Sequence, residues 1–321
     1  MGACRPQTPC LFLRVPRRAA PLGDRNRGSL RMRVYICKTQ LCTTQAMDDL
    51  LYIASEQGLV DDVRALLSNC NDIDKLSTDD YGVSRTPLFV ASQAGHPDVV
   101  RLLIDGGAKV DTLCQDKWTA LYVASQYGHA DVVRELLLQG ADVDKPCNGY
   151  SSLHVASQTG HPDVVRLLIN GGAKIDTPCK DKWTALYAAS QHGHIDVVRE
   201  LLLHGADIDQ LCDGWTVLES ASKAGHTHIV YELLKRHTFS NDRVWSALKV
   251  AKNTDISVML NLHDRPELFS SPDSSEGLVV RLLEELSQYR KMPAVLEDLI
   301  VGLAFGIVNL RRPLCTRSNE V

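Results

Sequence analysis

The chain has 321 residues, of which 44% are hydrophobic and 23% are charged, and its formal net charge is −4. This slightly acidic balance gives no basic footprint for nucleic acid, and no apolar run approaches the roughly 18 residues of a membrane-spanning helix. We therefore expect a soluble protein that binds neither nucleic acid nor membrane.

The ten cysteines bear on the redox environment of the protein. Arg14 interrupts the short apolar run from Cys10 to Val15, so the sequence has no credible signal peptide. Without an oxidising compartment the cysteines are expected to stay reduced. The sequence predicts a cytoplasmic protein, with a nuclear location as the alternative.

Residues 1–46 are predicted to be disordered, because they contain eight arginines, one acidic residue (Asp24), scattered prolines and no periodic pattern. An arginine-rich, acid-poor start also resembles a mitochondrial transit peptide, although its four prolines interrupt any amphipathic helix. Translation starting at Met47 is a further alternative.

From residue 86 onward the sequence repeats itself. Residues 116–147 return almost unchanged as 181–212, and residues 86–114 return as 151–179, both at an offset of 65. Each of these units is itself double, because the alanine of a recurrent Ala-Ser pair recurs at steps of 33, 32, 33 and 32 residues. A period in this range is typical of a stacked repeat array. The alanines are Ala91, Ala124, Ala156, Ala189 and Ala221.

One repeat is predicted to contain two short helices and a connector. Thr86 can cap the first helix, Pro87 suits its first position, and Gly95 can end it in a left-handed conformation. A second, more apolar helix begins at Pro97 and ends before Gly106. Helices this short are marginal alone in water, so neighbouring repeats must stack to bury them.

The pattern resembles the ankyrin repeat. The motif residues are Thr86-Pro87-Leu88, Gly128-His129, Val132-Val133, Leu136-Leu137 and Gly140-Ala141-Asp142. The resemblance implies an all-α repeat solenoid of stacked helix-turn-helix units with hairpin-like connectors, and a non-enzymatic binding function. The chain departs from the motif at the histidine after leucine, which is kept only at His154. It also departs at the connector glycine, which is replaced by Ser84, Lys117 and Lys182, so hairpin geometry is expected to vary.

The array is expected to span residues 48–262 in about seven units, of which the first and last are degenerate. In the last unit, Trp245-Ser246-Ala247-Leu248 echoes the Trp-Thr-Ala-Leu at the start of other first helices. Beyond it, we expect a linker at 263–275, a two-helix segment at 276–310 and a tail at 311–321. The ten-residue apolar run in the two-helix segment is too short to span a bilayer.

Cysteines and histidines that recur once per repeat invite a disulfide or metal interpretation. Equivalent atoms of stacked helices stand roughly 8–10 Å apart, which exceeds the roughly 7 Å limit for a disulfide, and a ladder cannot converge on one ion. The histidines follow the glycine that ends each first helix, where a capping role is expected. We predict no metal, cofactor or catalytic site. The residues are Cys114, Cys147, Cys179, Cys212, His96, His129, His161, His194 and His226.

The candidate partner-binding residues are those that vary between copies. One column, directly before the cap of each first helix, holds Arg85, Trp118, Tyr150, Trp183 and Trp215, with Trp245 in the degenerate unit. In an ankyrin-like arrangement this column should lie at the connector tips beside the concave face. Trp, Tyr and Arg are enriched at interface hot spots, but such rings can also simply cover neighbouring hairpins.

A second candidate column lies near the end of each first helix. It pairs a repeated glutamine with a variable neighbour, and the two near-identical copies differ there, with Tyr127 in one and His192 in the other. The glutamines are Gln93, Gln126, Gln158 and Gln191. The leading hypothesis is a monomeric module that binds a protein partner of unknown identity on its concave face. The alternatives are an adaptor that delivers a bound protein to a ubiquitin ligase or another enzyme through the C-terminal segment, and a spacer without a ligand.

Overall fold

The computed structural model describes residues 44–70, 72–78, 82–253, 256–257 and 260. The expectations for residues 1–43, for the linker at 263–275, for the two-helix segment at 276–310 and for the tail lie outside the described residues. No helix within the described ranges is both long enough and apolar enough to cross a membrane.

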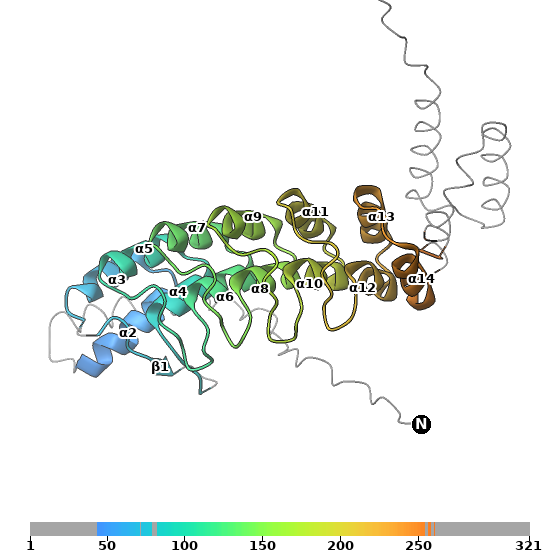
Figure 1. Ribbon diagram of the computed structural model, residues 1–321. Coiled ribbons are helices and arrows are strands. Elements are labelled where there is room, and N and C mark those ends of the chain that lie inside the picture. The colour runs from blue at the N-terminus through green and yellow to red at the C-terminus, as the bar shows by residue number, and fades with distance from the viewer. Residues whose placement is uncertain (1–43, 71, 79–81, 254–255, 258–259, 261–321) are drawn as a thin grey trace, which may run out of the picture.

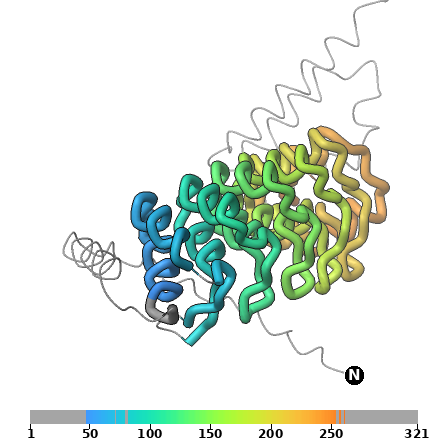
Figure 2. Tube along the Cα trace, turned by 90° about the vertical axis from the view of Figure 1, so that its left-hand side faces the viewer, coloured from blue at the N-terminus to red at the C-terminus, as the bar shows by residue number. Residues whose placement is uncertain are grey.

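Pairs of short antiparallel helices follow one another along the chain and stack into an elongated array (Figures 1 and 2). The first helices of the pairs form one row, with loops projecting beneath it, and the second helices form the other row (Figure 1). The first helices are α2 (Thr44–Glu56), α4 (Pro87–Ala94), α6 (Ala120–Tyr127), α8 (Ser152–Thr159), α10 (Ala185–His192) and α12 (Val217–Ala224). The second helices are α3 (Val60–Leu67), α5 (Pro97–Asp105), α7 (Ala130–Leu138), α9 (Pro162–Asn170), α11 (Ile195–Leu203) and α13 (Thr227–Arg236), and α14 (Asn241–Val250) follows them.

The expected start and stop signals of the first helices are present. The hydroxyl of Thr86 accepts a hydrogen bond from the backbone N–H of Phe89, and Pro87 occupies the first turn. Gly95 ends the same helix in the left-handed region at φ 78°. Because a side chain disfavours this conformation, the glycine fixes where the chain turns toward α5. The same arrangement recurs in the copies capped by Thr119, Ser151, Thr184 and Thr216.

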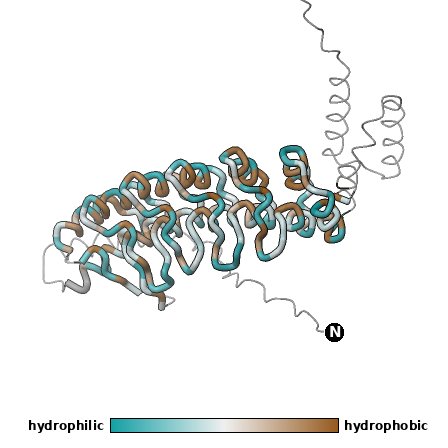
Figure 3. Tube along the Cα trace, in the orientation of Figure 1, coloured by the Kyte–Doolittle hydropathy of each residue, from teal (hydrophilic) through white to brown (hydrophobic). Residues whose placement is uncertain are grey.

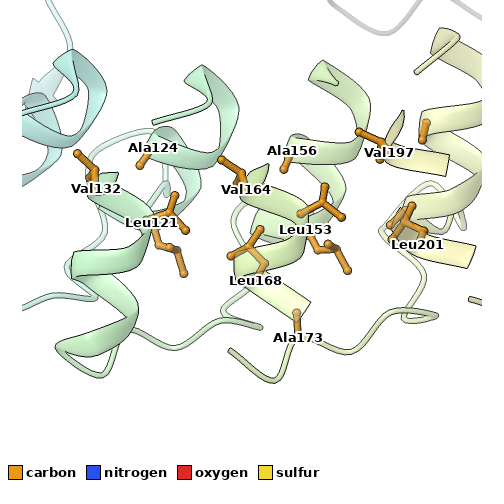
Figure 4. Packing of buried hydrophobic residues seen from close by; sticks show 14 of the residues in the cluster. Leu121, Ala124, Val132, Leu153, Ala156, Val164, Leu168, Ala173, Val197 and Leu201 are labelled. Carbon is orange, nitrogen blue, oxygen red and sulfur yellow. The ribbon is translucent and has the colours of Figure 1, made fainter. Parts of the chain in front are cut away.

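One continuous hydrophobic core runs the length of the array between the two rows of helices. In Figure 4, Leu121 and Leu153 from first helices lie alongside Val164 and Leu168 from a second helix. Hydropathy follows this arrangement, because apolar stretches occur in both rows of helices while polar stretches occur in the loops (Figure 3). Each helix is therefore buried by the repeats on either side of it.

The connectors have two alternating geometries, which explains the steps of 33 and 32 residues. Cys114 and Trp118 are joined by a backbone hydrogen bond across a three-residue loop, in which Lys117 has φ 59°. Cys147 and Tyr150 close a two-residue loop, in which Asn148 and Gly149 have φ of 53° and 84°. Two successive positive φ values are typical of a type I′ hairpin turn. The sequence-based expectation that hairpin geometry varies is thus confirmed.

The connector between α3 and α4 is the longest, and it forms a two-stranded sheet. Strand β1 (Ser77–Thr78) pairs antiparallel with β2 (Ser84–Arg85), and Ser77 lies opposite Arg85. This hairpin brings Arg85 to the same place before α4 that Trp118 occupies before α6.

The turn glycines also make room for the next repeat. A Cβ atom at Gly128 would lie 2.5 Å from Nδ1 of His161, and the equivalent glycines of four other repeats face the next histidine at 2.4–2.7 Å. By contrast, Gly140 has a similar φ of 80° but open space around its Cα. Gly128 therefore serves two purposes, a left-handed turn and the close approach of an imidazole ring.

We predict that Leu136→Ala destabilises the array by roughly 2–5 kcal/mol, as buried leucine truncations usually do. Leu136 is fully buried, whereas Leu138 on the same helix is 75% exposed and provides the matched control. Denaturant unfolding of the full chain measures both variants. An unchanged midpoint for Leu136→Ala, or an equal shift for Leu138→Ala, would show that the buried side of α7 is wrongly assigned.

A second prediction separates backbone strain from the loss of space for the imidazole. Gly140→Ala should cost about 1 kcal/mol, the strain of a left-handed residue with a side chain. Gly128→Ala should cost about 2–3 kcal/mol, because it also displaces His161 and its hydrogen bond. The difference in free energy of unfolding between the two variants is the measurement, and equal costs would contradict the proposed contact.

Candidate functional site

The first candidate column lies at the base of the hairpins, where each hairpin meets its first helix. Tyr150 pairs with Cys147, and Trp215 pairs with Cys212, across isolated β-bridges. The loop tips are instead formed by the residues with positive φ, such as Lys117. The expectation of a position at the connector tips is therefore wrong, because a residue directly before a helix cap must lie where the hairpin closes.

All five members of this column are half-buried, and each packs against a neighbouring side chain. The Arg85 guanidinium lies 5.4 Å from the Phe89 ring centroid. The Trp118 and Tyr122 rings are 5.5 Å apart, and those of Trp183 and Tyr187 are 5.3 Å apart. The ammonium of Lys180 lies 4.9 Å from the ring centroid of Tyr150, and that of Lys223 lies 4.3 Å from the ring centroid of Trp215. The rings are thus positioned by packing while part of each faces solvent.

Sequence reasoning missed a third column that joins the other two. Residues four apart lie on the same side of a helix, so Tyr122 and Gln126 share one side of α6, and Trp118, which precedes this helix, packs on Tyr122. Trp215 and Lys223 are eight residues apart and in contact, which shows that this side of α12 is continuous. The middle residues are Phe89, Tyr122, His154, Tyr187 and Glu219, and their spacing of four from the first column was the available signal.

Burial holds the aromatic and histidine members of the middle column in place and favours their neutral forms. It raises the pKa of the Tyr122 and Tyr187 phenols, because the charged form would lose its hydration. His154 is also buried, and its two ring nitrogens lie 2.8 Å from the Ser151 hydroxyl and 3.0 Å from the Trp183 carbonyl oxygen. This column therefore supports the half-exposed rings and links neighbouring repeats.

The second candidate column lies at the C-terminal ends of the first helices, as expected. Tyr127 is 36% exposed, and its ring stacks on His129 with centroids 6.2 Å apart. In the other copy, His192 stacks on His194 at 6.4 Å. The Gln93 amide donates to the Tyr127 hydroxyl across 3.2 Å. The variable side chains Tyr127 and His192 thus stack on histidines that recur in every copy.

We define the finger face as the surface formed by the first helices and the hairpin bases. Its residues are Arg85, Gln93, Trp118, Gln126, Tyr127, Tyr150, Gln158, Lys180, Trp183, Gln191, His192, Trp215 and Lys223.

Trp245 does not occupy a position of the first column. Helix α14 begins at Asn241, so Trp245 lies inside the helix, where it is 53% exposed. Only four residues separate α13 from α14, which leaves no hairpin between them. The alignment of Trp245 with the other tryptophans is therefore corrected.

The repeated histidines connect each repeat to the one before it. Because a carbonyl oxygen only accepts, the Nε2–H of each ring donates to a backbone carbonyl of the preceding first helix. The bonds from His129, His161, His194 and His226 reach Gln93, Gln126, Gln158 and Gln191 across 3.0, 3.1, 2.9 and 3.0 Å. No cap bond forms from these side chains, so the expected structural role is fulfilled between repeats and not at the helix start.

The described residues contain no group of three or more potential metal ligands of the His, Cys, Asp and Glu types. The recurrent cysteines lie buried at the hairpin bases, where Cys147 Sγ is 3.6 Å from the Thr119 hydroxyl. Burial raises the pKa of the Cys147 thiol, which favours the unreactive protonated form.

A family model described as ankyrin repeats (3 copies) matches residues 50–147 and 138–212, about half of the chain. The chain therefore belongs to the ankyrin repeat family, and its fold is an all-α repeat solenoid. Two similar solved structures are the ankyrin repeat domains of human ASB11 and of Bcl-3, a member of the IkappaB family. They are 24% and 28% identical, with TM-scores of 0.58 and 0.57. Each alignment covers 66% of this chain, with 96% of the ASB11 chain and 97% of the Bcl-3 chain. No curated protein matches the sequence.

Ankyrin repeats are protein–protein interaction modules, so the broad class of function is protein binding.

We predict that the array loses stability as pH falls from 7 toward 5. Burial lowers the pKa of His96, His161 and His194, an effect larger than that of their carbonyl hydrogen bonds. The unfolded chain takes up these protons near pH 6.5 while the folded chain does not, so the contribution is complete above that pH and is lost below it. Denaturant unfolding at several pH values measures the slope.

The double variant His161→Gln and His194→Gln should have a shallower slope over this range, whatever its absolute stability. His228→Gln, at an exposed position, is the matched control and should keep the slope of the unaltered chain. An unchanged slope in the double variant would exclude these two histidines as the cause.

Proposed function

We propose that the finger face, which corresponds to the concave side expected from the sequence, binds a protein partner without catalysis. The observation that carries this proposal is a row of half-exposed Arg, Trp and Tyr side chains at five successive hairpin bases. These residue types dominate interface hot spots, which favour partly desolvated, well-packed positions. The rigid stack beneath them lowers the entropic cost of binding, because the rings are already held by packing.

The variation between copies also supports this face as the binding surface. Many residues that pack one repeat on the next, such as Val132 and Val197, are the same in both copies, although the buried Val123 is replaced by Ala188. Tyr127 and His192 occupy equivalent positions on the face and differ. Recognition of a specific partner requires such differences, whereas a spacer does not.

The adaptor alternative concerns residues beyond 262, which lie outside the described residues. It predicts that the C-terminal segment has a partner of its own. Affinity purification of the full chain and of a variant ending at residue 262, followed by mass spectrometry, tests it. Loss of one group of binding proteins from the shorter variant is the expected result for an adaptor, and identical sets would contradict it.

We predict that Trp118→Ala and Trp183→Ala each weaken a cognate partner by at least about 1 kcal/mol, the usual threshold for a contributing interface residue. The two positions are two repeats, or roughly 20 Å, apart, so their folding costs should add in the double variant. Leu203→Ala is the matched control, because Leu203 is 69% exposed and lies on α11, in the row of second helices. Isothermal titration gives the affinity, and denaturant unfolding gives the folded fraction.

The opposite pattern would contradict the proposal. If the rings only cover the hairpins, the two variants lose stability while the molecules that remain folded keep their affinity. An equal loss of affinity in Leu203→Ala would likewise show that the position of the side chain does not matter.

A further inference from the structure

The finger face alternates between two kinds of contact from one repeat to the next. At α4, α8 and α12 a cation lies over a ring, in the pairs Arg85 with Phe89, Lys180 with Tyr150, and Lys223 with Trp215. At α6 and α10 two aromatic rings pack together instead. The face therefore has a period of two repeats, which is the period of the internal duplication.

The carboxylates near these cations are held in place by hydrogen bonds or by an ion pair. Asp181 accepts a hydrogen bond from the Tyr150 hydroxyl, and Asp213 lies 3.8 Å from the Lys182 ammonium. Glu219 accepts from the backbone N–H of Thr216 across 2.7 Å, at the start of α12. Asp116 is the exception, and the neighbouring Lys117 offsets its charge.

Lys180 and Lys223 are exposed, and each has a ring on one side of its ammonium group. Neither ammonium forms an ion pair within the described part of the chain. The second helices differ, because their arginines are paired with carboxylates of the same or the next repeat. Arg101 lies 2.8 Å from Glu135, and Arg166 lies 2.8 Å from Glu200. Lys180 and Lys223 are thus two exposed cations of the finger face that have no ion pair among the described residues.

We propose that the finger face binds an extended, acidic protein segment. Carboxylates of the segment pair with Lys180 and Lys223, while an apolar side chain between them packs on the ring of Trp183. An ammonium group that is partly shielded by a ring forms a stronger hydrogen bond with a carboxylate than a fully hydrated one. This inference rests on the proposed function and specifies the chemistry of the partner at the same site.

The spacing of the repeats sets the spacing of the partner's side chains. Adjacent repeats stand roughly 10 Å apart, so the cations are roughly 20 Å apart. An extended chain rises roughly 3.3 Å per residue and covers that distance in about six residues. The matching segment therefore has carboxylates about six residues apart and an apolar side chain midway between them.

The test uses the full chain and a fluorescent probe peptide with glutamates about six residues apart and leucines midway. A second peptide has glutamine in place of every glutamate. We expect the glutamate peptide to bind more tightly and to weaken with added salt, because exposed charges are screened. Lys180→Gln and Lys223→Gln should each weaken it by about two- to fivefold, as for an exposed ion pair, and leave the glutamine peptide unaffected.

Lys174→Gln is the matched control, since this exposed lysine lies after α9 and away from the finger face. Equal binding of the two peptides, no binding of the glutamate peptide, or an equal effect of Lys174→Gln would overturn the inference. Competition with a single-stranded DNA oligonucleotide gives a further check. If the oligonucleotide displaces the glutamate peptide as well as an unlabelled peptide of equal charge does, the inference is also overturned, because the face would then attract any polyanion.

The result also separates this inference from the proposed function. If Trp118→Ala weakens binding of the cognate partner while the lysine variants bind it normally, the finger face remains the proposed binding surface and the acidic character of the partner segment is wrong. If Trp118→Ala and the lysine variants all leave partner binding intact, both fail.

Discussion

Every feature of this protein depends on one constraint, which is that helices of eight or nine residues cannot persist alone in water. Each helix pair gains its stability from the repeats on both sides, through the continuous core and through the histidine bonds between repeats. The residues that form these contacts are therefore restricted in type, although single positions differ between copies, as at Val123 and Ala188. The small turn glycines belong to this set, since the imidazole of the next repeat occupies the space of their missing side chain.

The same constraint leaves the finger face free to vary. Side chains at the hairpin bases and helix ends contact their own repeat and solvent more than the core, so different residues are tolerated there. Alternating loops of three and two residues hold these positions at the same place relative to the first helices despite their different lengths. The result is a uniform scaffold that presents a row of cations and aromatic rings in a two-repeat pattern.

Much of the fold follows from the sequence, because its signals are local. The caps at Thr86 and Thr119 and the left-handed turn at Gly95 involve residues close together in the chain, and all are where the pattern predicts. The contacts that were missed depend on helix geometry or on neighbouring repeats. The middle column was considered only for the loss of a motif histidine, although its spacing of four from the rings predicts that the two columns share a side of the helix.

The start of α14 shows why degenerate repeats are harder to predict. Resemblance to the Trp-Thr-Ala-Leu motif placed the helix start near Ser246, but Asn241 begins the helix after an extended Ser240, with Asp242 in its first turn. With no hairpin to precede it, the helix extends back to this earlier signal. Repetition in the sequence is thus a reliable guide to the central repeats and a weaker guide to the ends.

The central claim is that the finger face is the surface that meets a partner, and hydroxyl-radical footprinting tests it most directly. The full chain is oxidised with and without a purified binding protein, and modification is measured residue by residue. The account predicts that binding protects Trp118, Tyr150, Trp183 and Trp215, while the exposed Leu138 and Leu203 on the second helices are modified as before. Protection of the second helices alone, with the four rings unchanged, would contradict it.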